Sequence, residues 1–316
     1  MTPEISIIIP AYNRERFIAI TLDSLIAQTF SNWECIVVDD GSSDQTFAIA
    51  QQVAQRDPRI RAVTKPNAGV ARARNHGYSL SNPQSPFVTF MDSDDLYHPE
   101  ALALMRQVLL DDPHAAAVHC LADMIDPAGN PLNPGTFAAF CRERLGLVDG
   151  RIRPLDVSQP IAFGNMLVKG IYPPGTVLTR RSAQDKAGLF DPDFRAGDDF
   201  EILIRVNRQG HFRLLDRVLL YYRRHDGNLS VESVRRNRRE FGLAWYKTFR
   251  SPHNTREQRR ILKRSYAAYQ LMKCSEKTRL IRQSLAQRSP SRALRYSAHF
   301  ALYYLRYLRG FPGKTG

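Results

Sequence analysis

Short apolar runs alternate with amphipathic segments over the first hundred residues. The strand-type runs each end in turn residues, and they occupy residues 5–9, 33–38, 60–63 and 86–91. Between them, apolar residues recur at helical spacing over residues 17–26 and 71–80. This alternation predicts an α/β fold with a mostly parallel sheet and helices on both of its faces.

The pattern changes in the second half of the chain. Residues 127–170 interrupt the alternation with several prolines and glycines, and we interpret them as an insertion whose loops determine specificity. A strand is predicted over residues 212–222 and a helix over residues 200–208. From residue 231 onward the pattern is helical, with few breakers before Pro290.

Charge divides the 316-residue chain into two parts. The net charge is +14, but 21 Lys and Arg stand against three acidic residues from Arg235 onward, so this tail carries +18 and residues 1–234 carry −4. A split of this kind predicts an acidic part that is catalytic and a basic part that binds an anionic partner. The four cysteines form no C-x-x-C pair, which argues against a zinc site or a disulfide framework and favours the cytoplasm. We find no signal peptide and no apolar window of about 18 residues.

Three carboxylates follow the strand that ends at Met91. Asp92, Asp94 and Asp95 repel one another unless a cation compensates them, and hard cations such as Mn²⁺ or Mg²⁺ take carboxylate oxygens and share other positions with phosphates. We interpret this turn as a site for a metal and a diphosphate. The alternative is that residues 93–95 only cap the helix that begins near Glu100.

Two further polar turns are predicted at the same edge of the sheet. Tyr12 follows the first strand, and Asp39 and Asp40 follow the second. Because ligands bind at the carboxyl ends of parallel strands, these turns could together hold an aromatic base, its polar edge and a metal-bound diphosphate.

Four segments make this hypothesis specific: SIIIPAYNRERFI, VVDDGSSDQT, NAGVARARNHG and FMDSDDLYHPE. In order and spacing they resemble the nucleotide-binding half of family 2 glycosyltransferases, and the similarity runs over roughly residues 4–230. The resemblance implies a GT-A fold, which is a Rossmann-like, mostly parallel sheet flanked by helices. We therefore expect a GT-A domain over residues 1–230, with a nucleotide-binding half (1–126) and an acceptor-side half (127–230), followed by a basic helical C-terminal region (231–316).

The resemblance also implies a nucleotide-binding set: Pro10, Tyr12, Asn13, Asp40, Arg74, Asn75, Asp92 and Ser93. In that set Tyr12 would stack on the base, Asp40 would accept from it, and Asp92 would face the ribose. Arg74 and Asn75 would lie beneath the diphosphate. Two alternatives stay open: Tyr12 covers the sheet, or Arg74 forms a salt bridge that offsets the acidic turns.

The same resemblance implies a metal site. Asp94 would be a ligand of Mn²⁺ or Mg²⁺, and His225, in a segment similar to the family's tyrosine-arginine-x-histidine segment, would complete its shell or bind the leaving group. Asp95 would assist or be structural. Arg223 and Arg224 would neutralise phosphate charge or be solvated. A single histidine is more often a surface residue than a ligand.

A second acidic pair stands much later in the chain. Asp198 and Asp199 resemble the family's catalytic pair, usually Glu-Asp, in which the second residue is the general base. A sugar hydroxyl that attacks an anomeric carbon must lose its proton, and a carboxylate can accept it. The alternative role for Asp199 is to cap the following helix.

The last helix is amphipathic. Ser291 can cap it, and it has a basic stripe: Arg292, Arg295, His299, Arg306 and Arg309. Opposite lies an apolar stripe: Leu294, Ala298, Ala301, Leu305 and Leu308. Such a helix suits an anionic membrane interface, and the alternative is packing on the catalytic domain or on a second subunit. No nucleic-acid-binding motif is present, so we expect no nucleic acid partner.

We therefore expect a metal-dependent hexosyltransferase that moves a sugar from a nucleotide sugar to a hydroxyl of a glycan or lipid-linked acceptor. The resemblance implies that the transfer inverts the anomeric configuration and that the donor is a UDP-sugar. Synthesis of polysaccharide, glycolipid or another cell-envelope glycan is expected, in the cytoplasm or at the inner face of its membrane. A homo-oligomer stays open. The alternatives are a sugar-nucleotide nucleotidyltransferase and a non-catalytic nucleotide- or membrane-binding protein.

Overall fold

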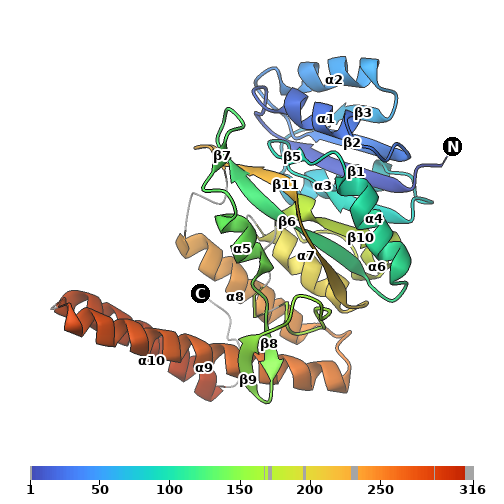
Figure 1. Ribbon diagram of the computed structural model, residues 1–316. Coiled ribbons are helices and arrows are strands. Elements are labelled where there is room, and N and C mark those ends of the chain that lie inside the picture. The colour runs from blue at the N-terminus through green and yellow to red at the C-terminus, as the bar shows by residue number, and fades with distance from the viewer. Residues whose placement is uncertain are drawn as a thin grey trace. The chain divides into compact units, whose positions relative to one another are not determined.

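The computed structural model describes residues 2–166, 168–169, 173–194, 197–228, 234–287 and 289–309, with the side chains of 234–241 and 307–309 excluded. The chain divides into two compact units (Figure 1). The first comprises Met1–Glu143, Val157–Ala162 and Ile171–Glu240, and the second comprises Arg144–Asp156, Phe163–Gly170 and Phe241–Gly316.

A nine-stranded sheet organises the first unit. Its strands are β1 (Ile5–Ala11), β2 (Trp33–Asp39), β3 (Ile60–Thr64), β4 (Phe87–Phe90), β5 (Leu96–Tyr97), β6 (Ala117–Ile125), β7 (Pro131–Leu132), β10 (Val177–Arg180) and β11 (Phe212–Arg223). Eight of them follow the order β3-β2-β1-β4-β10-β6-β11-β5, and β7 pairs with β6. β1 to β4 are parallel and so are β6 and β11, whereas β10 runs antiparallel to both of its neighbours. The predicted α/β fold with a mostly parallel sheet is confirmed.

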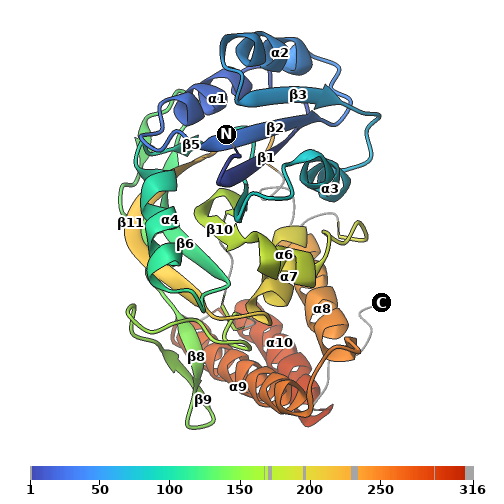
Figure 2. The same ribbon diagram turned by 90° about the vertical axis from the view of Figure 1, so that its right-hand side faces the viewer.

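Helices cover both faces of this sheet. They are α1 (Ile18–Ile26), α2 (Thr46–Arg56), α3 (Val70–Leu80), α4 (Ala101–Asp111), α5 (Thr136–Arg142), α6 (Arg181–Ala187) and α7 (Asp198–Asn207), with a short 3₁₀ turn η1 (Pro174–Thr176). Figure 2 shows α1 and α2 on one face of β1 to β3 and α3 on the other. Every residue of β1 is buried, as expected for a strand with helices on both sides. On the α3 face, Gly77 permits close packing, because a Cβ there would lie 2.5 Å from Cγ2 of Ile8.

The second unit is mainly helical. It holds α9 (Arg256–Ala286), α10 (Pro290–Arg309) and most of α8 (Val234–Arg250), together with the hairpin of β8 (Leu145–Val148) and β9 (Arg151–Pro154). α9 begins at a capping box between Thr255 and Gln258, and the buried Trp245 packs against Tyr266 of α9 with ring centroids 5.0 Å apart. α10 begins at Pro290, so Ser291 lies inside the helix and the predicted cap is wrong. Within the described residues, we find no helix with the length and apolarity needed to cross a bilayer.

Candidate active site

The carboxyl ends of β1, β2 and β4 form one edge of the sheet, and the polar turns that follow them lie there. The backbone N–H of Asp40 donates to the carbonyl of Ala11 (2.8 Å), which holds the second turn beside the first. Asp92 to Asp95 follow β4, the other neighbour of β1. We call the carboxylates of this region the acidic edge: Asp39, Asp40, Asp92, Asp94, Asp95, Asp198 and Asp199.

Asp94 contacts two groups from distant parts of the chain. Its Oδ2 atom lies 3.0 Å from Nε2 of His225 and 3.0 Å from Nε of Arg14. The His225 ring is fixed on its other side, because the N–H of Gly227 donates to Nδ1 (3.1 Å) and the Phe17 ring packs at 4.7 Å. The structure therefore brings together the two predicted metal ligands, which are 131 residues apart.

Arg14 joins the first turn to the His225 loop. Besides Asp94, its guanidinium donates to the carbonyl oxygens of Tyr12 (3.1 Å), Asn13 (3.0 Å) and Gly227 (3.0 Å). Arg14 received no role from the sequence, although it lies inside the first of the four motif segments. The motif marks its position, but its contact with Asp94 depends on two loops that meet only in the fold.

The Asp94–His225 pair suits a hard divalent cation. Carboxylate and imidazole are both acceptable ligands for Mn²⁺, and neighbouring ligands of an octahedral ion with bonds of ~2.1 Å stand about 3 Å apart, as this pair does. Within the described residues no group of three or more His, Cys, Asp or Glu side chains is placed to hold a metal. A cation held by this pair would therefore need further ligands from phosphate and water.

Arg74 bridges the second cluster of the acidic edge. Nη1 lies 2.6 Å from Oδ2 of Asp198 and Nη2 lies 2.8 Å from Oδ1 of Asp92, and the Arg74 side chain is buried. Burial lowers the pKa of Arg74, but the charges of Asp198, Asp92 and Asp199 outweigh it, so the pKa is raised and Arg74 stays cationic. Burial also raises the pKa of Asp92, against the opposing effect of Arg74. This is the salt bridge that the sequence left open as an alternative.

Asp199 lies in the first turn of α7 and is half-buried. Its Oδ1 accepts from the N–H of Phe200 (2.7 Å), while burial and then the charge of Asp198 raise its pKa to about 7. Asp199 is not the N-cap residue, because the helix begins at Asp198 with Gly197 as its N-cap. Its bond to the N–H of Phe200 still satisfies a first-turn donor. A carboxyl group that titrates near neutrality can accept a proton at physiological pH.

Asp40 organises the loop before α3. It forms an ion pair with Lys65 and accepts from the N–H groups of Ala68 (3.1 Å) and Gly69 (2.7 Å). A carboxylate offers about four acceptor positions, so three donors leave room for one more. Lys65 was another residue to which the sequence gave no role.

The remaining members of the predicted nucleotide-binding set differ in their surroundings. Tyr12 is 47% exposed, whereas Pro10 is buried in β1. Asn13 adopts φ 52° and its Oδ1 accepts from the N–H of Ser43 (2.9 Å). Ser93 is buried, and its carbonyl accepts from Oγ1 of Thr21.

Asn75 lies apart from this group of contacts. Its side-chain amide forms two 2.8 Å hydrogen bonds with the backbone of Phe190, one in each direction. These bonds tie α3 to the segment that leads to Asp198 and Asp199.

Two expectations about residues near Asp94 need correction. Residues 93–95 do not cap a helix, because β5 follows them and α4 begins only at Ala101, with Glu100 at its N-cap. Arg223 is neither solvated nor free for phosphate: it is 1% exposed, and its Nε donates to the carbonyl of Asp94 (2.8 Å). Its N–H also donates to Oδ1 of Asp95 (3.0 Å), which gives the buried Asp95 a structural contact.

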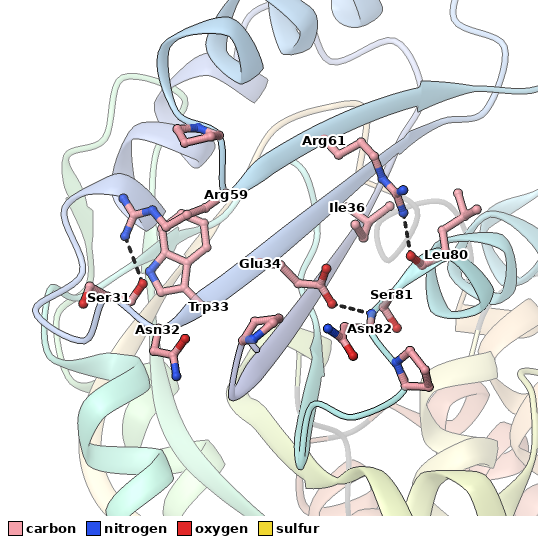
Figure 3. A pocket seen from close by; sticks show the side chains of 13 residues that line it. Ser31, Asn32, Trp33, Glu34, Ile36, Arg59, Arg61, Leu80, Ser81 and Asn82 are labelled. Carbon is pink, nitrogen blue, oxygen red and sulfur yellow. Dashed lines mark hydrogen bonds between the residues drawn. The ribbon is translucent and has the colours of Figure 1, made fainter. Parts of the chain in front are cut away.

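A pocket of about 760 Å³ lies at the opposite end of the strands. Figure 3 shows Trp33 and Glu34 from the start of β2, Arg59 and Arg61 around the start of β3, and Asn82 after α3. The Arg59 guanidinium stacks over the Trp33 ring at 3.9 Å. The pocket contains none of the predicted site residues.

Comparison with known families and proteins agrees with the motif segments. Residues 6–153 match the model of Glycosyl transferase family 2. The chondroitin synthase of Pasteurella multocida (strain Pm70) is 33% identical over 144 residues, which are 45% of this chain. That match spans only 15% of the synthase, so the similarity covers one domain-sized part of it.

Two solved structures share the fold. The mannosyltransferase PcManGT from Pyrobaculum calidifontis, in complex with GDP-Man and Mn²⁺, has a TM-score of 0.65 and 18% identity, with 98% of this chain and 86% of that chain covered. S. aureus TarS 1–349, in complex with UDP-GlcNAc, has a TM-score of 0.62 and 16% identity, with 98% and 92% covered. Both neighbour structures contain a nucleotide sugar.

Proposed function

Because residues 6–153 belong to glycosyl transferase family 2 and the fold is GT-A, we propose that the acidic edge binds a nucleotide sugar and transfers its sugar to a hydroxyl acceptor. The contact between Asp94 and His225 supports this proposal most strongly, since a carboxylate and an imidazole 3.0 Å apart suit a cation that binds a diphosphate.

The nucleotide would lie over the turns after β1 and β2. Tyr12 offers an exposed aromatic face for the base, and Asp40 has an acceptor position left for a base N–H. Asp92, held by Arg74, would accept from a ribose hydroxyl. We propose a UDP-sugar as donor; one neighbour structure contains UDP-GlcNAc and the other GDP-Man, so the base must be identified by experiment.

Asp94 and His225 would hold Mn²⁺ or Mg²⁺, and Arg14 would have to move off Asp94 or remain as a second cation beside it. The bound ion would supply positive charge against the leaving diphosphate.

Asp199 would act as the general base. In the proposed step its carboxylate takes the proton of the acceptor hydroxyl, the hydroxyl oxygen bonds to the anomeric carbon, and the bond from that carbon to the diphosphate breaks. Attack from the face opposite the diphosphate inverts the anomeric configuration. A hexose donor and an inverting outcome are both part of this proposal.

For the acceptor we propose a glycan or lipid-linked saccharide in polysaccharide, glycolipid or cell-envelope synthesis. The similarity to part of a chondroitin synthase supports the glycan class. A lipid-linked acceptor would bring the enzyme to the inner face of the cytoplasmic membrane.

Donor turnover tests the proposal directly. Purified protein with Mn²⁺ is incubated with a panel of nucleotide sugars, with and without bacterial lipid extract, and nucleoside diphosphate release is measured. Release that is lost in Asp94→Asn and in Asp199→Asn, but kept in the surface variant Arg56→Ala, supports the proposed roles. Pyrophosphate exchange would instead indicate a nucleotidyltransferase, and nucleotide binding without turnover would indicate a binding protein.

A further inference from the structure

α10 does not pack on α9 through its aliphatic face, which is the face that an amphipathic helix usually buries. The two helices run side by side (Figure 1). The less exposed face of α10 holds the buried Ala293 and five half-buried residues: Tyr296, His299, Phe300, Tyr303 and Arg306. Sγ of Cys274 lies 3.9 Å from the carbonyl of Phe300, and Nζ of Lys277 lies 5.7 Å from the centroid of the Tyr296 ring. This face therefore carries three Phe and Tyr rings but none of the described leucines of α10.

The aliphatic residues of α10 point outward. We call them the outer stripe: Leu294, Ala298, Ala301, Leu302 and Leu305. Leu294 is 75% exposed, Leu302 45% and Leu305 52%. Scattered exposed leucines are ordinary, but three on one face of one helix form an apolar surface that the packing of α10 on α9 leaves uncovered.

Exposed arginines lie on the same helix as the outer stripe. Arg292 and Arg295 are both exposed on the same helix. Over residues 256–309 the sequence has fourteen Lys and Arg against two Glu. Both glutamates are in α9, and Glu276 already pairs with Lys273 and Lys277.

We propose that the outer stripe of α10 docks on the surface of an anionic phospholipid bilayer. A helix with an exposed aliphatic stripe and exposed arginines matches the two layers of such a surface, since leucines enter the acyl boundary while guanidinium groups meet lipid phosphates. A second copy of the chain would have to bring the same positive charge against itself. A nucleic acid would engage the arginines but leave the leucines in water.

This inference rests on the proposed location of the enzyme at the cytoplasmic membrane and not on any catalytic role. Vesicle binding therefore tests it without a measurement of turnover. The full chain is sedimented with vesicles of phosphatidylcholine and with vesicles in which about a third of the lipid is phosphatidylglycerol. We expect binding to the second kind only. Leu294→Ser/Leu305→Ser should lower that binding at least about tenfold, because both side chains would lose a buried position in the bilayer. Arg292→Gln/Arg295→Gln should lower it about tenfold as well.

A matched control removes exposed leucines elsewhere. Leu110→Ser/Leu132→Ser changes two residues of the first unit that are 44% and 36% exposed, and it should bind vesicles as the wild type does. Far-ultraviolet circular dichroism and nucleoside diphosphate release in solution should be the same in all variants. Absence of release from every variant would count against the proposed function and leave the vesicle result to be judged separately.

Three results would overturn the inference. The wild-type chain could fail to bind anionic vesicles. Binding could survive the leucine changes and depend on the arginines alone, which would mean simple adsorption of charge. The chain could form a dimer in sedimentation velocity that the leucine changes abolish, with no vesicle binding, which would assign the stripe to a second copy.

Discussion

At the acidic edge, buried carboxylates meet cations of the same chain. Lys65 faces Asp40, Arg74 joins Asp92 to Asp198, and Arg14 reaches Asp94. In the hairpin of α9 and α10, by contrast, fourteen Lys and Arg stand against only two glutamates, and the aliphatic side chains of α10 are exposed.

The difference concerns what each region must bind. Buried charges are costly unless they are paired, so the acidic edge holds its carboxylates in fixed positions through arginine and lysine. Such fixed groups suit a ligand that is itself charged and small. The hairpin carries an excess of positive charge and an exposed aliphatic stripe. These two features suit an extended surface of opposite charge.

The largest effect on turnover at the acidic edge is expected from a change of the proposed general base, Asp199. Asp199→Asn should lower kcat by about 10²–10⁴, because the asparagine amide cannot accept the acceptor's proton. The dissociation constant of the donor, measured by calorimetry, should change little. Normal turnover in this variant would remove Asp199 from the mechanism.

Loss of the Arg74 side chain, which bridges Asp92 and Asp198, should destabilise the fold. Arg74→Ala leaves Asp92 and Asp198 near one another without a partner, and we expect the free energy of unfolding to fall by about 3–5 kcal/mol. Urea denaturation measures this change. The control is Arg56→Ala, whose exposed pair with Asp23 should contribute less than about 1 kcal/mol. Equal effects in the two variants would show that burial of the Arg74 pairs is unimportant.

A smaller effect is expected at the base-stacking position. Tyr12→Ala should weaken nucleotide binding by about 1–3 kcal/mol, as for other base–aromatic stacks, whereas Tyr12→Phe keeps the ring and should bind normally. The two dissociation constants distinguish stacking from a role in covering the sheet. If Tyr12→Ala bound nucleotide as tightly as the wild type, the stacking role would be withdrawn.

The smallest change is one of pH. Because the pKa of Asp199 is raised to about 7, kcat should fall about fivefold between pH 7 and pH 6, as the ionised fraction drops. The sign for stability is opposite. The unfolded carboxyl titrates near 3.8 and the folded one near 7, so the folded state keeps the proton in between and the free energy of unfolding falls as pH rises through that window. Asp199→Asn should remove this part of the pH dependence of unfolding, and an unchanged profile would contradict the raised pKa.

Periodicity and turn chemistry predicted much of the first unit. The strands at residues 5–9, 33–38 and 60–63 were found because their apolar runs are continuous and their turns are local. The meeting of Asp94 with His225 was implied by the resemblance to the family, although these residues are far apart in the chain.

Contacts between distant loops could not be predicted in the same way. The role of Arg14 depends on its contacts with Gly227 and Asp94, which only the fold brings close to it. The burial of Arg223 likewise depends on backbone carbonyls of distant loops, such as that of Asp94. The amphipathic pattern of α10 gave two faces but not which of them packs, because aromatic residues beside the apolar stripe compete for the inner position.

Calorimetric titration of the full chain with UDP, and with GDP as the second nucleotide, tests whether Asp94 and His225 hold the cation. With Mn²⁺ present, we expect binding that weakens at least about tenfold in Asp94→Asn and in His225→Asn, but not in Arg56→Ala. Nucleotide binding of equal strength in the presence of a chelator, or in Asp94→Asn with Mn²⁺, would contradict the claim that these two side chains hold the cation that binds the diphosphate.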